Sequence, residues 1–136
     1  MTRTVAALPV IVMLWLASVI AGPAVALAEP PPPCFYTLSP PSVVEEQGAT
    51  LVTATVEPTR CGFPAEPRFG VACVQRQGDN SHVTCTQGKG TDVAHVFVAF
   101  QPGATYVATG RACGGWVGIS ETGVPCQQLG PISATL

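Results

Sequence analysis

The chain has 136 residues, six lysines and arginines, eight aspartates and glutamates, and a formal net charge of −2 at pH 7. So few basic residues exclude a surface that holds nucleic acid, or an anionic membrane, through a polybasic patch. All six cysteines follow an uncharged apolar N-terminal stretch: Cys34, Cys61, Cys73, Cys85, Cys113 and Cys126. An even number of cysteines in a short exported chain predicts three disulfides rather than metal or redox chemistry.

The first 28 residues have the pattern of a secretory signal peptide. No charged side chain occurs from Val5 to Val25, and Ala26-Leu27-Ala28 offers small residues to a signal peptidase. The densest apolar run, Val10 to Ile20, is shorter than the roughly 20 residues that a membrane-spanning helix needs. We therefore expect cleavage after Ala28, a secreted or envelope-associated protein, and no stable membrane insertion afterwards. The alternative is an uncleaved anchor from Val5 to Leu27.

The residues after the signal peptide suffice for one compact domain. Glu29 to Pro33 is predicted to form an extended polyproline tether, since proline has no amide donor and a fixed φ. From Cys34 to Leu136, apolar residues do not recur at helical spacing, whereas valine, threonine and alanine alternate between glycine and proline clusters. This pattern predicts an all-β domain over residues 34–136.

Two segments have clear strand patterns. Thr50 to Val56 alternates, which predicts a half-buried strand. One side carries Val52, Ala54 and Val56, and the other carries Leu51, Thr53 and Thr55. Asp92 to Phe100 is apolar on both faces apart from His95, which favours a central strand.

A hairpin is predicted around a turn whose residues tolerate positive φ. It comprises three segments: Phe69 to Gln77, Gly78-Asp79-Asn80 and Ser81 to Gln87. A turn centred on Asp79 places Cys73 directly opposite Cys85. The same face carries Val71 and Val83, so we expect this pair of cysteines on the apolar side of the hairpin.

The segment from Phe100 to Ala112 resembles the corner between strands E and F of fibronectin type III and other immunoglobulin-like domains. In that family an apolar residue ends strand E, a Pro-Gly turn follows, and a tyrosine bonds its hydroxyl back to the corner; Phe100, Pro102-Gly103 and Tyr106 match in order. The resemblance implies an immunoglobulin-like antiparallel β-sandwich of about seven strands. Antibody domains have a buried cysteine where this chain has Ala108, so the six cysteines must instead cross-link the periphery.

Six cysteines allow many connectivities, and their spacing alone does not choose among them. The resemblance places the start of strand A and the end of strand B at one end of the sandwich, and puts the remaining cysteines on the C–C′ hairpin and beside the F–G loop. It thus implies three pairs: Cys34–Cys61, Cys73–Cys85 and Cys113–Cys126.

Only His82 and His95 could act as general bases near neutral pH, and neither lies in a recognisable nucleophile motif. A structural role is the simpler interpretation for both. Cys-x₂-Cys spacing is absent, and oxidation would remove the thiolates that a zinc site needs. We therefore predict no catalysis, no cofactor and no metal.

The candidate binding residues are apolar and lie on or near the B–C and F–G loops: Trp116, Phe63, Ile119 and Phe69. Aromatic side chains on disulfide-restrained loops lose little entropy on contact and therefore make good anchors. The alternative for Trp116 is a lid, folded back over the open end of the sandwich.

The leading hypothesis is a secreted, non-catalytic binding module with an unknown protein or cell-surface partner and no nucleic acid. A second possibility is a small-ligand carrier similar to the enediyne apoproteins, which are small exported actinobacterial sandwiches of similar composition. A cleft lined by Trp116 and Phe69 would favour that carrier. The third is a structural protein of the cell envelope, since the alanine, valine, glycine and proline content resembles exported actinobacterial proteins. The sequence leaves the oligomeric state open.

Overall fold

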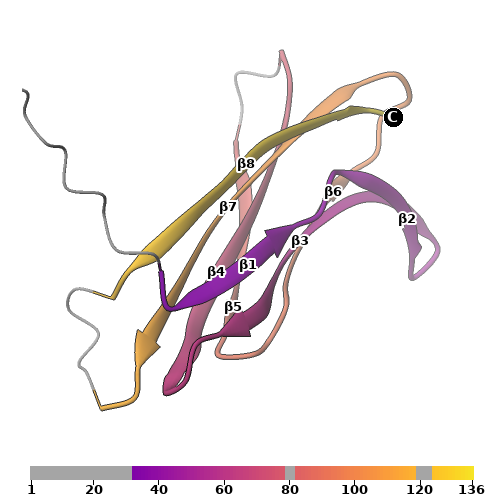
Figure 1. The fold of residues 1–136 in the computed structure, drawn as a ribbon. Helices are drawn as coiled ribbons and strands as arrows, with labels where there is room; N and C mark the ends of the chain where they lie inside the picture. The colour runs from indigo at the N-terminus through magenta and orange to yellow at the C-terminus, as the bar shows by residue number, and fades with distance from the viewer. Residues whose placement is uncertain (1–31, 79–81, 119–123) are drawn as a thin grey trace, which may run out of the picture.

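A computed structural model describes residues 32–78, 82–118 and 124–136. Over these residues the chain forms eight β-strands and no helix, in two antiparallel sheets (Figure 1). The strands are β1 (Cys34–Leu38), β2 (Ser42–Glu46), β3 (Ala49–Cys61), β4 (Ala65–Arg76), β5 (Thr84–Lys89), β6 (Ala94–Ala99), β7 (Thr105–Trp116) and β8 (Cys126–Thr135). The all-β architecture expected from the alternating pattern is confirmed.

The first sheet is built around β3. Strand β6 pairs with one edge of β3, while β1 and β2 follow one another along the other edge. Pro40-Pro41 separates β1 from β2, because proline has no amide with which to continue a ladder. This interruption explains why there are eight strands where about seven were expected.

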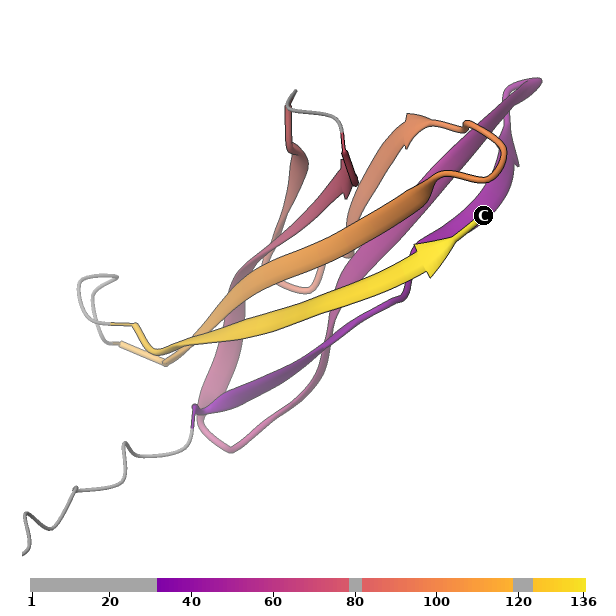
Figure 2. The same cartoon turned by 90° about the horizontal axis from the view of Figure 1, so that it is seen from above.

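The second sheet has the strand order β5-β4-β7-β8, and it packs face to face against the first (Figure 2). Three residues of β3 that the alternation predicted on one face are buried: Val52, Ala54 and Val56. They meet Ala72 and Val74 of β4 and Tyr106 and Ala108 of β7 in one core. Alanine at several of these positions lets the two sheets approach closely.

The expectation of a central strand over Asp92 to Phe100 is wrong. Among the described residues, β6 pairs only with β3, so it lies at an edge of its sheet. Ala94 and Val96 are buried, whereas His95 and Phe97 are exposed on the outer face, with ring centroids 6.2 Å apart and nearly parallel. The apolar run led to a wrong prediction because a strand with an aromatic pair on its solvent face has nearly the same composition as a strand buried on both faces.

The β4–β5 hairpin has the expected register, with Cys73 opposite Cys85, but not the expected orientation. Its buried face carries Gly70, Ala72 and Val74, while Cys85 is exposed on the outer face. Close packing of the sheets explains this choice, since a Cβ added at Gly70 would lie 3.0 Å from Val56 Cγ1. The residues 79–81 at the centre of the predicted turn lie outside the described residues.

All three disulfides join residues that face each other on neighbouring antiparallel strands. They are Cys34–Cys61 between β1 and β3, Cys73–Cys85 between β4 and β5, and Cys113–Cys126 between β7 and β8. These pairs are the ones implied by the resemblance, and none of them links the two sheets. At the centre of the sandwich Ala108 is fully buried.

Tyr106 closes the corner between β6 and β7 as expected. Its side chain is buried, and its hydroxyl donates to the carbonyl oxygen of Ala99 at 3.1 Å and accepts from the amide of Gln101 at 2.8 Å. Gly103 adopts a φ of 75° in the turn between them, which favours glycine.

Candidate functional site

The candidate site is the end of the sandwich at which β1 begins and β3 and β7 end, at the lower left of Figure 1. We call residues 62–65 and 116–118 the tip. The two segments lie side by side, because Ala65 pairs with Trp116 and the amide of Val117 donates to the carbonyl oxygen of Pro64 at 3.1 Å. The C-terminus lies at the opposite end of the molecule in both ribbon views (Figure 2).

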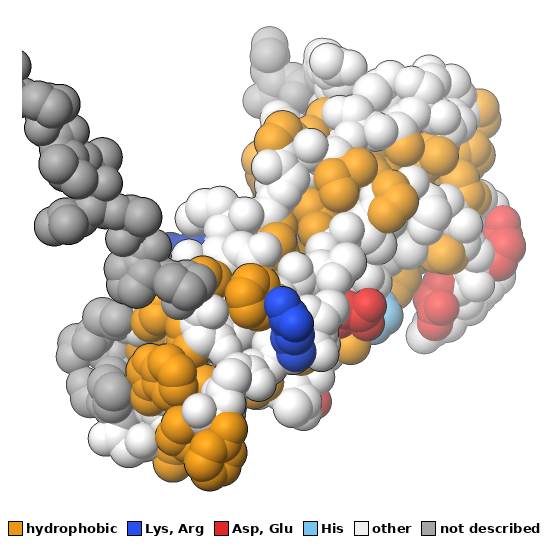
Figure 3. Space-filling view, in the orientation of Figure 1, with side chains coloured by type: hydrophobic (Ala, Val, Ile, Leu, Met, Phe, Trp, Pro, Cys, Tyr) orange, Lys and Arg blue, Asp and Glu red, His pale blue; other side chains and the backbone are white. Residues whose placement is uncertain are grey.

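Apolar side chains are exposed on the tip. Phe63 has 98% of its surface exposed, Val117 62% and Trp116 40%. Figure 3 shows hydrophobic side chains gathered at this end of the molecule. Phe63 and Trp116, which were predicted to share one end, are thus placed on neighbouring segments.

The other two candidate residues do not belong to the tip. Phe69 lies farther along β4, half-buried and paired with Lys89 and Cys113. Ile119 lies outside the described residues.

Disulfides and backbone hydrogen bonds brace the tip. Cys61, which directly precedes Gly62, is bonded to Cys34, and Cys113–Cys126 joins the strands that lead into and out of the β7–β8 connection. The amide of Gly62 donates to the carbonyl oxygen of Pro33 at 2.8 Å, and the amide of Ala65 donates to the carbonyl oxygen of Gly62 at 2.6 Å. Pro33 is buried, so it packs with the domain rather than extending freely as the predicted tether would.

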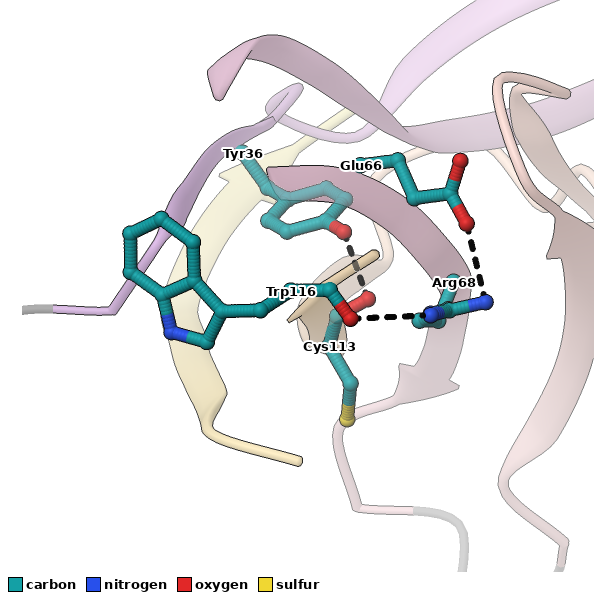
Figure 4. Close-up of polar contacts among 5 residues, drawn as sticks. All are labelled: Tyr36, Glu66, Arg68, Cys113 and Trp116. Atoms are coloured by element: carbon teal, nitrogen blue, oxygen red, sulfur yellow. Dashed lines mark hydrogen bonds and ion pairs between the residues drawn. The ribbon is translucent and has the colours of Figure 1, made fainter. Parts of the chain in front are cut away.

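A polar cluster lies directly behind the tip (Figure 4). The guanidinium of Arg68 donates to the carbonyl oxygen of Trp116 at 3.3 Å and forms an ion pair with Glu66 at 2.9 Å. Tyr36 donates its hydroxyl to the carbonyl oxygen of Cys113 at 2.6 Å. These contacts fix the end of β7 to β4 and β1, so the strand that carries Trp116 is held on two sides.

Sequence reasoning missed Tyr36 and Arg68. The alternation of Cys34, Tyr36 and Leu38, all buried, was a signal that could have found Tyr36. No comparable signal pointed to Arg68, because the carbonyl group that it binds belongs to Trp116, at the far end of β7. Burial raises the pKa of the Tyr36 hydroxyl, and a backbone hydrogen bond at Arg68 opposes this rise.

The glycines before Trp116 serve close packing. A Cβ at Gly114 would overlap the Cβ and Sγ of Cys34, and one at Gly115 would lie 3.2 Å from Arg68 Nε. Trp116 follows Gly114 by two positions and therefore projects from the same side of β7, toward the start of β1. Figure 4 shows the indole on the opposite side of its backbone from Arg68.

A hollow of about 210 Å³ opens between the sheets, away from the tip. Its lining residues come from β4 to β7 and the connection before β5: Val74, Arg76, His82, Thr84, Val98, Ala99 and Tyr106. Neither Trp116 nor Phe69 lines it. Its volume is below the roughly 300–1,000 Å³ of typical ligand cavities.

The two histidines lie in different places and do not form a common site. His82 lies beside the hollow and His95 on the outer face of β6. Among the described residues, no three histidine, cysteine, aspartate or glutamate side chains group closely enough to hold a metal ion.

Comparisons with protein-family models, curated proteins and solved structures gave no significant match for this chain. Within the described part of the chain, no helix is long and apolar enough to cross a membrane.

Proposed function

We propose that the protein is an exported immunoglobulin-like module that binds an unknown protein or cell-surface partner through its tip, without catalysis. The observation that carries this proposal is the nearly complete exposure of Phe63 on a turn whose backbone is held in place. Large apolar side chains exposed together on one braced surface are typical of interaction sites.

The immunoglobulin-like assignment is supported by strand order and by the corner around Tyr106. The β1/β2, β3 and β6 strands correspond to A, B and E of that fold, and β5-β4-β7-β8 correspond to C′, C, F and G. The tip then corresponds to the B–C and F–G loops, which lie at the same end of such sandwiches.

Export is supported by the cysteines. Three disulfides and no free thiol fit an oxidising compartment, where such bonds persist. The apolar segment 1–28 that prompted this proposal lies outside the described residues.

The bracing of the tip favours binding because a rigid anchor has little conformational entropy left to lose. Immobilising a mobile side chain costs about 0.5–1.5 kcal/mol on association, and loop ordering adds to this cost. At the tip, Cys34–Cys61 and the hydrogen bonds of Gly62 and Ala65 already restrict the turn that presents Phe63.

The small-ligand carrier is less well supported. The hollow between the sheets, of about 210 Å³, and a second hollow of about 290 Å³ beside Gln77 and Gln101 are both small, and neither is lined by Trp116 or Phe69, the two residues expected to line a carrier cleft. We therefore prefer a binding surface at the tip.

The test is capture of a partner from the native envelope and medium by immobilised, oxidised chain starting at Glu29. A Phe63→Ser variant serves as the probe and Val83→Ser as the control, because Val83 is also exposed (53%) but lies on the connection before β5. We expect capture that is lost with Phe63→Ser and kept with Val83→Ser. Equal capture by all three proteins would contradict the proposal.

A further inference from the structure

Building on the proposed function, we propose that the partner of the tip is a lipid bilayer surface, on which the domain docks reversibly and end-on. The tip, as defined above, contains no charged side chain. Phe63 and Val117 project from it as hydrocarbon, and Trp116 adds an indole, the amphipathic side chain that is enriched at membrane–water interfaces.

The backbone of the tip suits an apolar environment. In lipid, an unsatisfied amide or carbonyl group costs several kcal/mol. The amides of Gly62, Ala65 and Val117 all have backbone acceptors, and Pro64 has no amide. Phe63 therefore enters the interface beside three amides that already have partners.

The charged side chains of the domain also favour docking with the tip toward the bilayer. Behind the tip, the guanidinium of Arg60 lies 4.7 Å from the ring centroid of Phe35, and Arg68 is paired with Glu66. Glu45 and Glu46 lie on β2, toward the other end of β3, and Figure 3 shows acidic side chains over that region. The docking is thus driven by apolar side chains, with Arg60 near the headgroups and the acidic end away from an anionic surface.

The chain also enters the domain at the tip, since the carbonyl oxygen of Pro33 bonds to Gly62. The preceding sequence is a short proline-rich segment and then the uncharged stretch from Val5 to Val25. The part of the chain that precedes Pro33 therefore joins the domain at the tip.

A bilayer fits this surface better than a folded protein does. Specific protein interfaces use about 20–30 residues on each side and roughly one hydrogen bond per 100–200 Å². Within residues 62–65 and 116–118, the Trp116 indole is the only side chain with a hydrogen-bonding group. A lipid surface requires neither extended shape complementarity nor hydrogen-bond partners.

The experiment uses the oxidised chain from Glu29, which holds the complete domain, because all core residues and all three disulfides lie after Pro33. Trp116 is the only tryptophan in that chain, so its fluorescence reports on the tip. Vesicles of equal parts phosphatidylcholine and phosphatidylglycerol are the probe. We expect co-sedimentation, a blue shift of the emission, and quenching by lipids brominated on the acyl chain.

Phe63→Ser should weaken vesicle binding by about tenfold or more, the loss expected when one apolar side chain of this size is not buried. Val117→Ser should weaken it less, and Val83→Ser should bind as the unaltered protein does. Thermal melts of each variant verify that folding is retained. Vesicle binding that is absent, or unchanged by Phe63→Ser, would overturn the inference.

Two other outcomes would overturn the lipid assignment while keeping the tip as a binding surface. One is Phe63-dependent capture of an envelope protein without vesicle binding. The other is Phe63-dependent self-association, seen as a dimer in sedimentation, again without vesicle binding. If Phe63→Ser affects no interaction of any kind, both the inference and the proposed function are wrong.

Discussion

A buried tyrosine lies toward each end of the sandwich, and the two tyrosines stabilise different kinds of contact. At the corner between β6 and β7, the hydroxyl of Tyr106 bonds to Ala99 and Gln101, which are seven and five residues away in the chain. Toward the tip, the hydroxyl of Tyr36 bonds to Cys113, 77 residues away, and its amide donates to the Gln127 side chain at 3.1 Å. One tyrosine fixes a local turn, and the other ties β1 to the opposite sheet.

This difference matters because no disulfide joins the two sheets. Each bond between cysteines stays within one sheet, so the sheets are held together by core packing and by polar contacts such as those of Tyr36. Stability at the tip is thus expected to depend on side chains distant in sequence, whereas the Tyr106 corner is a self-contained unit.

The largest effect is expected from removing the disulfide next to the tip. Replacing Cys34 and Cys61 together with alanine should cost about 4 kcal/mol, because the bond closes a loop with a sequence separation of 27 and Cys34 is buried. The matched removal of Cys73–Cys85, with a separation of 12 and on the outer face, should cost about 3 kcal/mol. Urea melts of the two double variants measure the difference in the free energy of unfolding. A larger loss on removing Cys73–Cys85 would contradict the expectation that Cys34–Cys61, next to the tip, contributes more to stability.

The two hydroxyls give the next effect. Tyr106→Phe should cost about 2–3 kcal/mol, since it leaves both an acceptor and a donor without their partner. Tyr36→Phe should cost about 1–2 kcal/mol, since one hydroxyl hydrogen bond to a carbonyl is lost. Equilibrium denaturation measures the free energy of unfolding of both variants. A change within error at Tyr106 would remove the support that the corner gives to the immunoglobulin-like assignment.

A smaller effect should appear at alkaline pH. Burial raises the pKa of Tyr36 above its ordinary value of about 10, so the folded protein keeps the phenol neutral while the unfolded chain ionises it. This contribution to stability is fully present below about pH 10 and is lost as the pH rises through the raised pKa. The free energy of unfolding should therefore fall less steeply above about pH 10 in Tyr36→Phe than in the unaltered protein. Identical alkaline slopes would show that ionisation of Tyr36 is not coupled to folding.

The smallest effect is expected at the tip itself. Phe63→Ser should change the free energy of unfolding by less than about 0.5 kcal/mol, because the side chain is almost fully exposed. Val83→Ser provides the comparison at an exposed site away from the tip. A loss of more than about 1 kcal/mol at Phe63 would mean that its ring packs against the domain in solution, and would weaken its proposed role as an anchor.

The parts of the fold that could be predicted were those encoded within a few residues of each other. The alternation around Val52, the register that pairs Cys73 with Cys85 and the corner at Tyr106 each depend on a short stretch of chain. The orientation of the β4–β5 hairpin could not be read in this way. It depends on whether Gly70 or Val71 fits against β3, which is a contact between sheets.

The candidate site shows the same division. Loop position was enough to predict that Phe63 and Trp116 lie at the same end of the sandwich. Arg68 and Tyr36, which hold the end of β7, were missed because the β7 carbonyl groups that they bind, those of Trp116 and Cys113, are far away in the sequence. Phe69 was expected to line a cleft together with Trp116, and the structure places it along β4, away from the tip.

The confinement of each disulfide to one sheet has a mechanical consequence. The three bonds enclose segments with sequence separations of 27, 12 and 13 residues, which together make up about half of the domain. A pulling force applied to the two ends of the chain can lengthen only the other half while the bonds remain oxidised. Under load the two sheets can separate, since no disulfide links them. Three pairs of strands stay covalently linked: β1 and β3, β4 and β5, and β7 and β8. The domain can refold from these linked pairs.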